Sequence, residues 1–183
     1  MKSFFNLALL LAVLQSGNCL SAQTIPTGWS AYNDTAAKIN FGLPVAAISV
    51  DSLHTRFYAG IVDSLLAIQV HIFDSAYVNS SEGLFGGALT QESGDTLRAI
   101  AKLILFATKI DLLSLSNITV DSNNGIEIGL DYKTLQSDIP TLTFIRYFLL
   151  NHNFIVFTIT GSKNDLPRYL SYKSDFFGTI EFY

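Results

Sequence analysis

The chain has 183 residues, of which 49% are hydrophobic and 14% are charged. This length suits one domain with a real core plus a short extra segment, and the composition excludes an intrinsically disordered protein. The formal charge is −4 and no run of Lys or Arg occurs, which disfavours nucleic acid and anionic membrane surfaces as partners, because both require clustered basic residues.

Residues 1–22 have the build of a secretory signal peptide. One early basic residue, Lys2, precedes a mainly apolar run that is too short to span a bilayer, and Leu20-Ser21-Ala22 provides a cleavage site before Gln23. Removal of this segment leaves 10 basic against 15 acidic residues, a formal charge of −5. We therefore expect an exported protein, periplasmic or extracellular and bacterial, without a transmembrane span.

The single cysteine, Cys19, allows a second interpretation of the amino end. If Cys19 is lipid-modified, the mature protein is tethered to a membrane at its first residue. Lipoprotein signals place a small residue before that cysteine, and Asn18 stands there instead, which favours cleavage after Ala22. The mature chain then has no cysteine, so its stability must come from packing and not from disulfides.

Residues 23–37 form a polar lead-in, expected to be extended, whose Trp29 is interpreted as a core or edge aromatic and not as a sugar-stacking platform. Residues 38–183 form the single folded domain. Its first part predicts an antiparallel meander with strands over 39–44, 45–50, 55–62 and 65–73, since apolar residues alternate with polar or small ones in the last run. Pro44 cannot donate to a ladder and should mark a strand start or an edge.

The clearest helical pattern follows a loop over residues 77–91. Its apolar stripe recurs at spacings of three and four, after a candidate N-cap at Ser93 or Asp95, and consists of Leu97, Ile100, Ala101, Ile104, Leu105 and Thr108. Residues 111–116 fit neither the helical nor the strand period. Strands over 117–120 and 126–132 then flank the polar segment 121–125, in which Asn124-Gly125 is a dipeptide typical of hairpin turns, because both residues accept positive φ at little cost.

The densest aromatic and β-branched run predicts a hairpin of residues 142–150 and 154–160 around a two-residue turn at Asn151-His152. Strict antiparallel register places Arg146 on one face and Tyr147 on the other. The first face holds Leu142, Phe144, Arg146, Phe148, Ile155, Phe157 and Ile159. The second holds Ile145, Tyr147, Leu149, Phe154 and Val156. Because both faces are apolar, the hairpin should be central in the sheet and covered on both sides.

A final helix should cover one of these faces. It is expected to begin near Asn164 or Asp165, with Pro167 in its first turn. The helix over 97–108 should lie beside it or across the opposite face.

This order of elements resembles the PsbP-like family over residues 39–182. The resemblance rests on the hairpin Arg146-Tyr-Phe-Leu-Leu-Asn-His-Asn-Phe-Ile-Val-Phe-Thr-Ile-Thr-Gly161 and on a last helix that runs into Asp175-Phe-Phe-Gly-Thr-Ile180. The fold is shared by a thylakoid-lumen photosystem subunit, a Ran-binding nuclear import factor and small exported bacterial proteins of unknown role. It implies an α+β fold, an α-β-α sandwich around a central antiparallel β-sheet, in proteins that bind or assist macromolecules and are not established enzymes. No cation-binding or Ran-contacting residue of the better-known members is matched here, so no family site is carried over.

Catalytic, metal and cofactor sites find no support in the sequence. Nucleophile-elbow, dinucleotide-binding and P-loop motifs are absent. Glu127 or Asp131 would need to meet Glu181 in a cleft for acid/base chemistry, and nothing in the sequence brings them together. The histidines lie apart, with no cluster of further ligands; they are His54, His71 and His152. We therefore predict a protein that is not an enzyme and has no cofactor.

Arg146 is the one charge on an otherwise apolar strand face. It can reach the rim of the sheet, pair with Glu127 or Asp131 on the neighbouring hairpin, or mark a ligand pocket, and we favour the pairing. The leading functional hypothesis is an exported non-catalytic domain that binds or assists a macromolecular partner, a protein of the cell envelope. The alternative is a carrier of small apolar ligands, with a pocket between the sheet and the first helix and Arg146 or Tyr147 at its mouth. An enclosed apolar cavity under that helix would favour the carrier, whereas a filled core with an exposed apolar patch would favour partner binding.

Overall fold

The computed structural model describes residues 24–44, 47–63, 65–74, 77, 97–99, 101–102, 111–133, 140–150 and 153–183. Ten strands and one helix with a short 3-10 turn before it are defined in this part of the chain. The strands are β1 (Trp29–Asp34), β2 (Ile39–Pro44), β3 (Ile48–Ser52), β4 (Thr55–Asp63), β5 (Leu66–Asp74), β6 (Asp111–Val120), β7 (Asn123–Lys133), β8 (Pro140–Leu150), β9 (Asn153–Ser162) and β10 (Glu181–Phe182). The 3-10 turn spans Lys163–Asp165, and helix α4 follows over Leu166–Gly178. Residues 97–99 and 101–102 are also helical.

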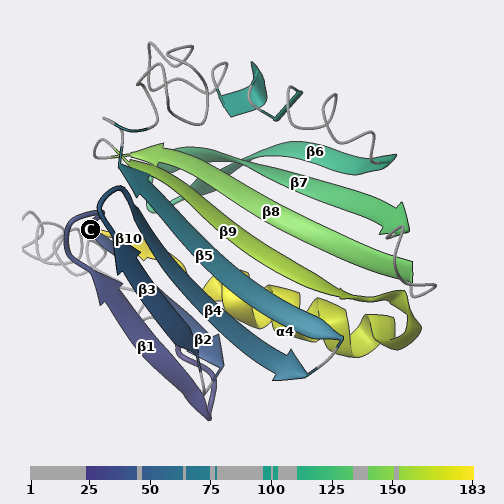
Figure 1. The fold of residues 1–183 in the computed structure, drawn as a ribbon. Coiled ribbons are helices and arrows are strands. Elements are labelled where there is room, and N and C mark those ends of the chain that lie inside the picture. The colour runs from purple at the N-terminus through teal and green to yellow at the C-terminus, as the bar shows by residue number, and fades with distance from the viewer. Residues whose placement is uncertain are drawn as a thin grey trace, which may run out of the picture.

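The strands form two antiparallel sheets (Figure 1). Seven strands form the larger sheet in the order β3-β4-β5-β9-β8-β7-β6, and three form the smaller one in the order β1-β2-β10. The predicted hairpin is β8–β9, with Leu150 opposite Asn153 and Phe148 opposite Ile155, which is the predicted register. Its strands are the fourth and fifth of seven, so the predicted central position is confirmed.

Both faces of this hairpin are covered, as expected. Helix α4 and the smaller sheet pack on the face that carries Phe148 and Phe157 (Figure 1). These two rings are fully buried, and each contributes roughly 1.5–3 kcal/mol through removal of apolar surface from water. On the opposite face, Leu97 and Ala101 of the first helix pack with Tyr147 and its neighbours. The protein is therefore an α+β sandwich around a central antiparallel sheet.

Helix α4 begins where the sequence predicts. Ser162 accepts a hydrogen bond at Oγ from the Asn164 amide, 3.1 Å away, which starts the 3-10 turn, and a proline stands in the first turn of α4. Its buried side chains are Tyr169, Phe176 and Phe177. The helix ends where the Thr179 hydroxyl donates to the Phe176 carbonyl at 2.7 Å. The described residues contain no helix long and apolar enough to cross a membrane.

The predicted hairpin with its connection within residues 121–125 is confirmed, but the predicted turn position at Asn124-Gly125 is wrong. Strand β6 includes the ambiguous residues 111–116 and ends at Val120, and the turn is Asp121-Ser122, with φ of 47° and 67°. Gly125 lies inside β7 opposite Phe148, and a Cβ atom there would stand 2.5 Å from Cε1 of that ring. The glycine therefore serves the close approach of an aromatic ring and not a turn.

The early meander is confirmed for β3, β4 and β5 but not for residues 39–44. That segment, β2, pairs with β1 and β10 in the smaller sheet. Pro44 is the last residue of β2 and not its first. On one side Pro44 pairs with Trp29 of β1, and on the other side β10 pairs only with Ile39 and Asn40. Strand β1 lies within residues 23–37 and joins the lead-in to the domain.

Several predictions of local structure lie outside the described residues. They are the signal peptide with its cleavage site, the loop after residue 77, the N-cap at Ser93 or Asp95, and the turn at Asn151-His152. Four residues of the helical stripe also lie outside the described residues, namely Ile100, Ile104, Leu105 and Thr108. These stay predictions.

Candidate functional site

Arg146 lies in a cluster of charges between the sheet and α4. Its Nε donates to Oε2 of Glu127 at 2.8 Å, and Glu127 lies directly opposite Arg146 on the neighbouring strand β7. Lys173 of α4 donates from Nζ to Oε1 of the same carboxylate at 2.7 Å. The predicted pairing of Arg146 with Glu127 is thus present, and a second cation shares its partner.

Aromatic rings hold both cations in place. The Arg146 guanidinium lies 4.2 Å from the centre of the Phe177 ring, and the Lys173 ammonium lies 3.7 Å from that of Phe144. Arg146 Nη1 also donates to the Phe177 carbonyl at 3.4 Å, near the carboxyl end of α4, where a positive charge is favourable. The geometry leaves little freedom to either side chain.

The carboxylate at the centre is ionised in the neutral range. Burial by itself would raise the pKa of Glu127, but the hydrogen bonds from Lys173 and Arg146 outweigh it and lower that pKa below its ordinary value. The three charged side chains are each between 13% and 22% exposed. The cluster is therefore largely shielded from water, and its formal net charge is +1.

An open depression of about 480 Å³ lies against this cluster. It is lined by Arg146, Leu170, Lys173, Ser174, Phe177 and Gly178. This volume falls within the range of ligand sites, roughly 300–1,000 Å³. The depression is open to solvent and lies on the α4 face of the sheet, away from the first helix.

Tyr147, the other predicted ligand residue, lies elsewhere. It is buried on the opposite face of β8, where its ring stacks on Phe154 at 5.6 Å, and this burial raises the pKa of Tyr147 to about 12. Successive residues of a strand point to opposite faces. The structure therefore does not bring Arg146 and Tyr147 to one pocket.

The remaining candidate acids do not meet. Asp131 pairs with Lys163, and Glu181 accepts a hydrogen bond from Asn40 Nδ2 at 2.9 Å. The acid/base pairs with Glu181 considered from the sequence are thus not formed.

The described histidines lie against aromatic rings. His54 stacks on Tyr77 at 5.3 Å, and His71 lies 4.5 Å from Phe57, where burial lowers the pKa of His71. His152 lies outside the described residues. Within the residues that the structure describes, no group of three or more His, Cys, Asp or Glu is arranged to hold a metal ion.

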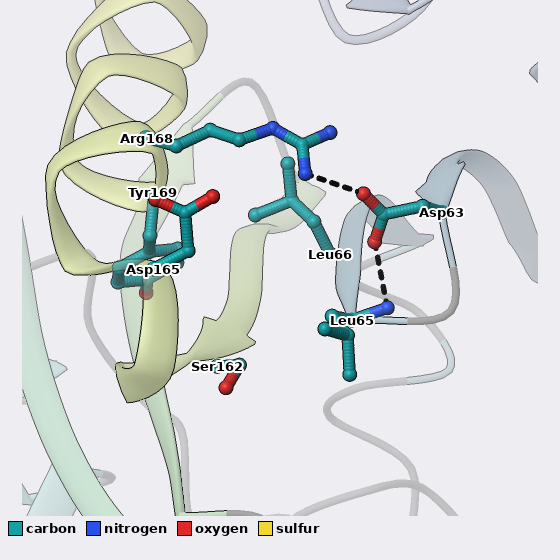
Figure 2. Close-up of a pocket in the computed structure, with 7 residues that line it drawn as sticks. All are labelled: Asp63, Leu65, Leu66, Ser162, Asp165, Arg168 and Tyr169. Atoms are coloured by element: carbon teal, nitrogen blue, oxygen red, sulfur yellow. Dashed lines mark hydrogen bonds and ion pairs between the residues drawn. The ribbon is translucent and has the colours of Figure 1, made fainter.

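A second, smaller cavity lies at the amino end of α4. Figure 2 shows Arg168 reaching from the helix to Asp63, which it meets at 2.7 Å, while the second oxygen of Asp63 accepts the Leu65 amide at 2.7 Å. That backbone hydrogen bond is the main cause of the lowered pKa of Asp63. The cavity measures about 40 Å³, which is room for a water molecule and not for a ligand.

Two features of these surfaces escaped the sequence analysis. Lys173 gives no sequence signal for its pairing, because it is 46 residues from Glu127. Strand β3 is exposed along its whole length, including Ile48 and Val50. Apolar and polar residues alternate in the sequence of β3, and such a pattern predicts a strand with one buried face. In the structure neither face of β3 is buried.

No protein-family model and no curated protein matches the chain. Solved structures do. The solution structure of cyanobacterial PsbP (CyanoP) from Synechocystis sp. PCC 6803 matches with a TM-score of 0.53 and 16% identity, over 91% of this chain and 98% of that chain. The chain has the PsbP-like fold.

Two further solved structures resemble this PsbP-like domain. A crystal structure from Bacteroides thetaiotaomicron VPI-5482 has a TM-score of 0.51 at 9% identity, over 86% of this chain and 49% of that chain. A point mutant of the protein Mog1 has a TM-score of 0.46 at 8% identity, over 82% of this chain and 86% of that chain. At such identities the likenesses to CyanoP and to the Bacteroides thetaiotaomicron structure show the fold alone. The predicted PsbP-like architecture is confirmed.

Proposed function

We propose that this PsbP-like chain is an exported, non-catalytic domain that binds a protein partner in the cell envelope. The observation that carries the proposal is the open edge of the seven-stranded sheet at β3. All five residues of β3 are exposed, and β4 is its only strand neighbour among the described residues. An open edge offers backbone N–H and C=O groups to an extended segment of another chain.

Apolar side chains extend this edge onto one face of the sheet. Ile48 and Val50 of β3 and Ile61 of β4 are 57%, 53% and 59% exposed. Ile48 stands opposite Ala59, and Ile61 is two residues beyond Ala59, so all three point to the same face. We call Ile48, Val50 and Ile61 the edge patch. Contiguous exposed apolar surface of this kind is typical of interaction sites.

The other edge of the sheet is less suited to strand addition. Strand β6 also exposes apolar residues, Leu112 and Leu113, but its register with β7 shifts between Leu112 and Ser114. Such a bulge breaks the ladder and protects an edge from pairing. The pairing of β3 with β4 is regular from Ile48 to Ser52, so β3 presents the unbroken ladder.

The described packing under the first helix favours partner binding over the carrier alternative. Leu97 and Ala101 are almost fully buried against the sheet, in one cluster with Tyr147 and Phe154. The described side chains there contact one another and form one hydrophobic cluster, which is the packing expected of a core and not of a ligand pocket. The PsbP-like fold supports a binding role by analogy only, and the signal-like residues 1–22 support export.

Capture from envelope extract tests this function. The tagged mature protein, as wild type, Val50→Lys and Leu112→Lys, is incubated with extract, and the bound proteins are compared. Both variants place a lysine on an exposed edge strand, so Leu112→Lys is the matched control. We expect a partner that wild type and Leu112→Lys retain and Val50→Lys loses. Capture that Val50→Lys leaves unchanged, or a co-purifying lipid or metabolite without a protein, would overturn the proposal.

Fractionation tests the compartment separately. A Cys19→Ala variant should be released with the soluble envelope fraction like wild type, because we expect cleavage after Ala22. Loss of a wild-type membrane association in this variant would show lipid anchoring instead.

A further inference from the structure

The depression beside α4 has a positive charge that the described residues do not neutralise. Arg146 and Lys173 share the single carboxylate of Glu127, and neither has a second acidic partner in that part of the chain. The chain as a whole is acidic, with a formal charge of −4. A local excess of +1 on an acidic protein is complementary to an anionic group of a partner.

The shape of the depression follows from the sequence of α4. Leu170, Ser174 and Gly178 are four residues apart and therefore lie on one side of the helix. Ser174 and Gly178 are small, which keeps this side of the helix low, and Leu170 is 43% exposed at one end. The Phe177 ring lies beneath the Arg146 guanidinium. The depression thus combines two cations with an apolar wall.

We propose that this depression binds a segment of the partner protein in which an Asp or Glu side chain stands next to a large apolar residue. Arginine recognises a carboxylate through paired N–H groups, and Lys173 adds a second donor. The apolar neighbour of the acid would cover Leu170. The inference rests on the proposed function only in assigning the segment to a protein partner.

The openness of the depression favours a peptide over a fatty acid. An acyl chain requires an enclosed apolar channel, whereas a peptide backbone stays hydrated along an open surface. The hydrogen bonds to Glu127 and the ring contacts already order both cations, so binding loses little side-chain entropy. Glu127 is therefore a positioning residue in this site.

A peptide titration tests the site without the partner. The ¹⁵N-labelled protein is titrated with acetyl-Leu-Glu-Phe-amide and with acetyl-Leu-Gln-Phe-amide as the neutral counterpart. We expect the acidic peptide to shift the amide signals of residues 170–178 and of residues around Arg146, and the neutral peptide to shift none. Salt should weaken binding, and Lys173→Gln should weaken it about tenfold through the loss of one charge-assisted hydrogen bond.

Two exposed serines of α4 provide a matched pair of variants. Ser174→Phe fills the depression and should abolish the shifts, whereas Ser171→Phe adds the same ring to the same helix at a position that does not line the depression and should preserve them. Arg168→Gln removes a cation of α4 that pairs with Asp63 and should also preserve binding.

The inference is overturned if both peptides shift the same signals, if Ser174→Phe still binds, or if the acidic peptide causes no shift up to about 10 mM. Shifts with decanoate but not with the acidic peptide would identify a fatty-acid site and overturn it too. A failed titration leaves the capture result at β3 intact, and failed capture leaves the titration intact.

Discussion

Replacement of Glu127 by Gln tests the charge cluster most sharply. The change leaves Arg146 and Lys173 close together with no shared anion, while the shape of the side chain is kept. Loss of one partner from a fully buried ion pair costs about 3–5 kcal/mol, and an exposed pair is worth about 0.2–1 kcal/mol. Since the three side chains are 13–22% exposed, we expect a loss between these limits, about 2 kcal/mol.

Urea denaturation at pH 7 measures this free energy of unfolding. A loss of about 2 kcal/mol corresponds to a decrease in Tm of roughly 4–8 °C for a domain of this size. Asp175→Asn, at an exposed carboxylate of α4, is the control and should change the free energy by less than about 0.5 kcal/mol.

The pH dependence gives an independent check on Glu127. Its pKa is lower in the folded protein than its ordinary value of 4.5, so its ionisation stabilises the fold above that value. That contribution is lost as the pH falls through the lowered folded pKa. The difference between wild type and Glu127→Gln should therefore be full at pH 7 and shrink progressively below pH 4.5. A difference under about 0.5 kcal/mol at pH 7, or one that does not shrink in acid, would refute a stabilising cluster.

Three further changes, one of them with a matched control, test the packing of the fold by the same denaturation assay. Gly125→Ala should cost about 1–3 kcal/mol, because its Cβ would overlap an aromatic ring and a backbone carbonyl. The control, Gly178→Ala, should be neutral or stabilising, because the added Cβ finds open space there. Equal effects of the two changes would contradict this reasoning. Ser122→Gly should stabilise the protein by up to about 1 kcal/mol, since glycine accepts the φ of 67° without strain, and a loss of stability would disprove that turn. Asp34→Asn should cost about 3 kcal/mol, because Asp34 is buried and accepts from Arg56 at 2.5 Å; a change under about 1 kcal/mol would show that this ion pair does not join the two sheets.

The central hairpin was predictable because its information is local. Two apolar runs separated by two residues determine the register by counting, and apolar side chains on both faces require cover on both faces. Strand β7, the neighbour of β8, carries Glu127 opposite Arg146, and proximity of the hairpins in sequence was enough to suggest that pair. The start of the final helix was predictable from the polar residues Asn164 and Asp165 and from Pro167 in its first turn.

The misplaced turn shows where local information fails. Asn124-Gly125 has the composition of a hairpin turn, but Gly125 is required by the Phe148 ring, which reaches it from β8. That contact is fixed by sheet register over 23 residues of sequence and not by the dipeptide. Asp121 and Ser122 are weaker turn formers, and the pairing of β6 with β7 forces them into positive φ.

The smaller sheet and the complete charge cluster depend on tertiary packing. Nothing within residues 39–44 distinguishes a strand of the main meander from one paired with β1 and β10. Lys173 reaches Glu127 because buried Tyr169 and Phe176 set the rotation of α4 over the sheet. Sequence periodicity identifies the buried face of a helix, but it does not say which strand residue each side chain will meet.

Photo-crosslinking in the cells that produce the protein tests partner binding at β3 most directly. A photoreactive amino acid replaces Ser49 of β3 in one variant and Ser116 of β6 in another, both at exposed positions of edge strands. We predict one discrete crosslinked protein from position 49 and none from position 116. The crosslink at position 49 should be absent when residues 1–22 are deleted and the chain is not exported. The same crosslinked products from both positions, or none from position 49, would contradict a partner that binds at the β3 edge.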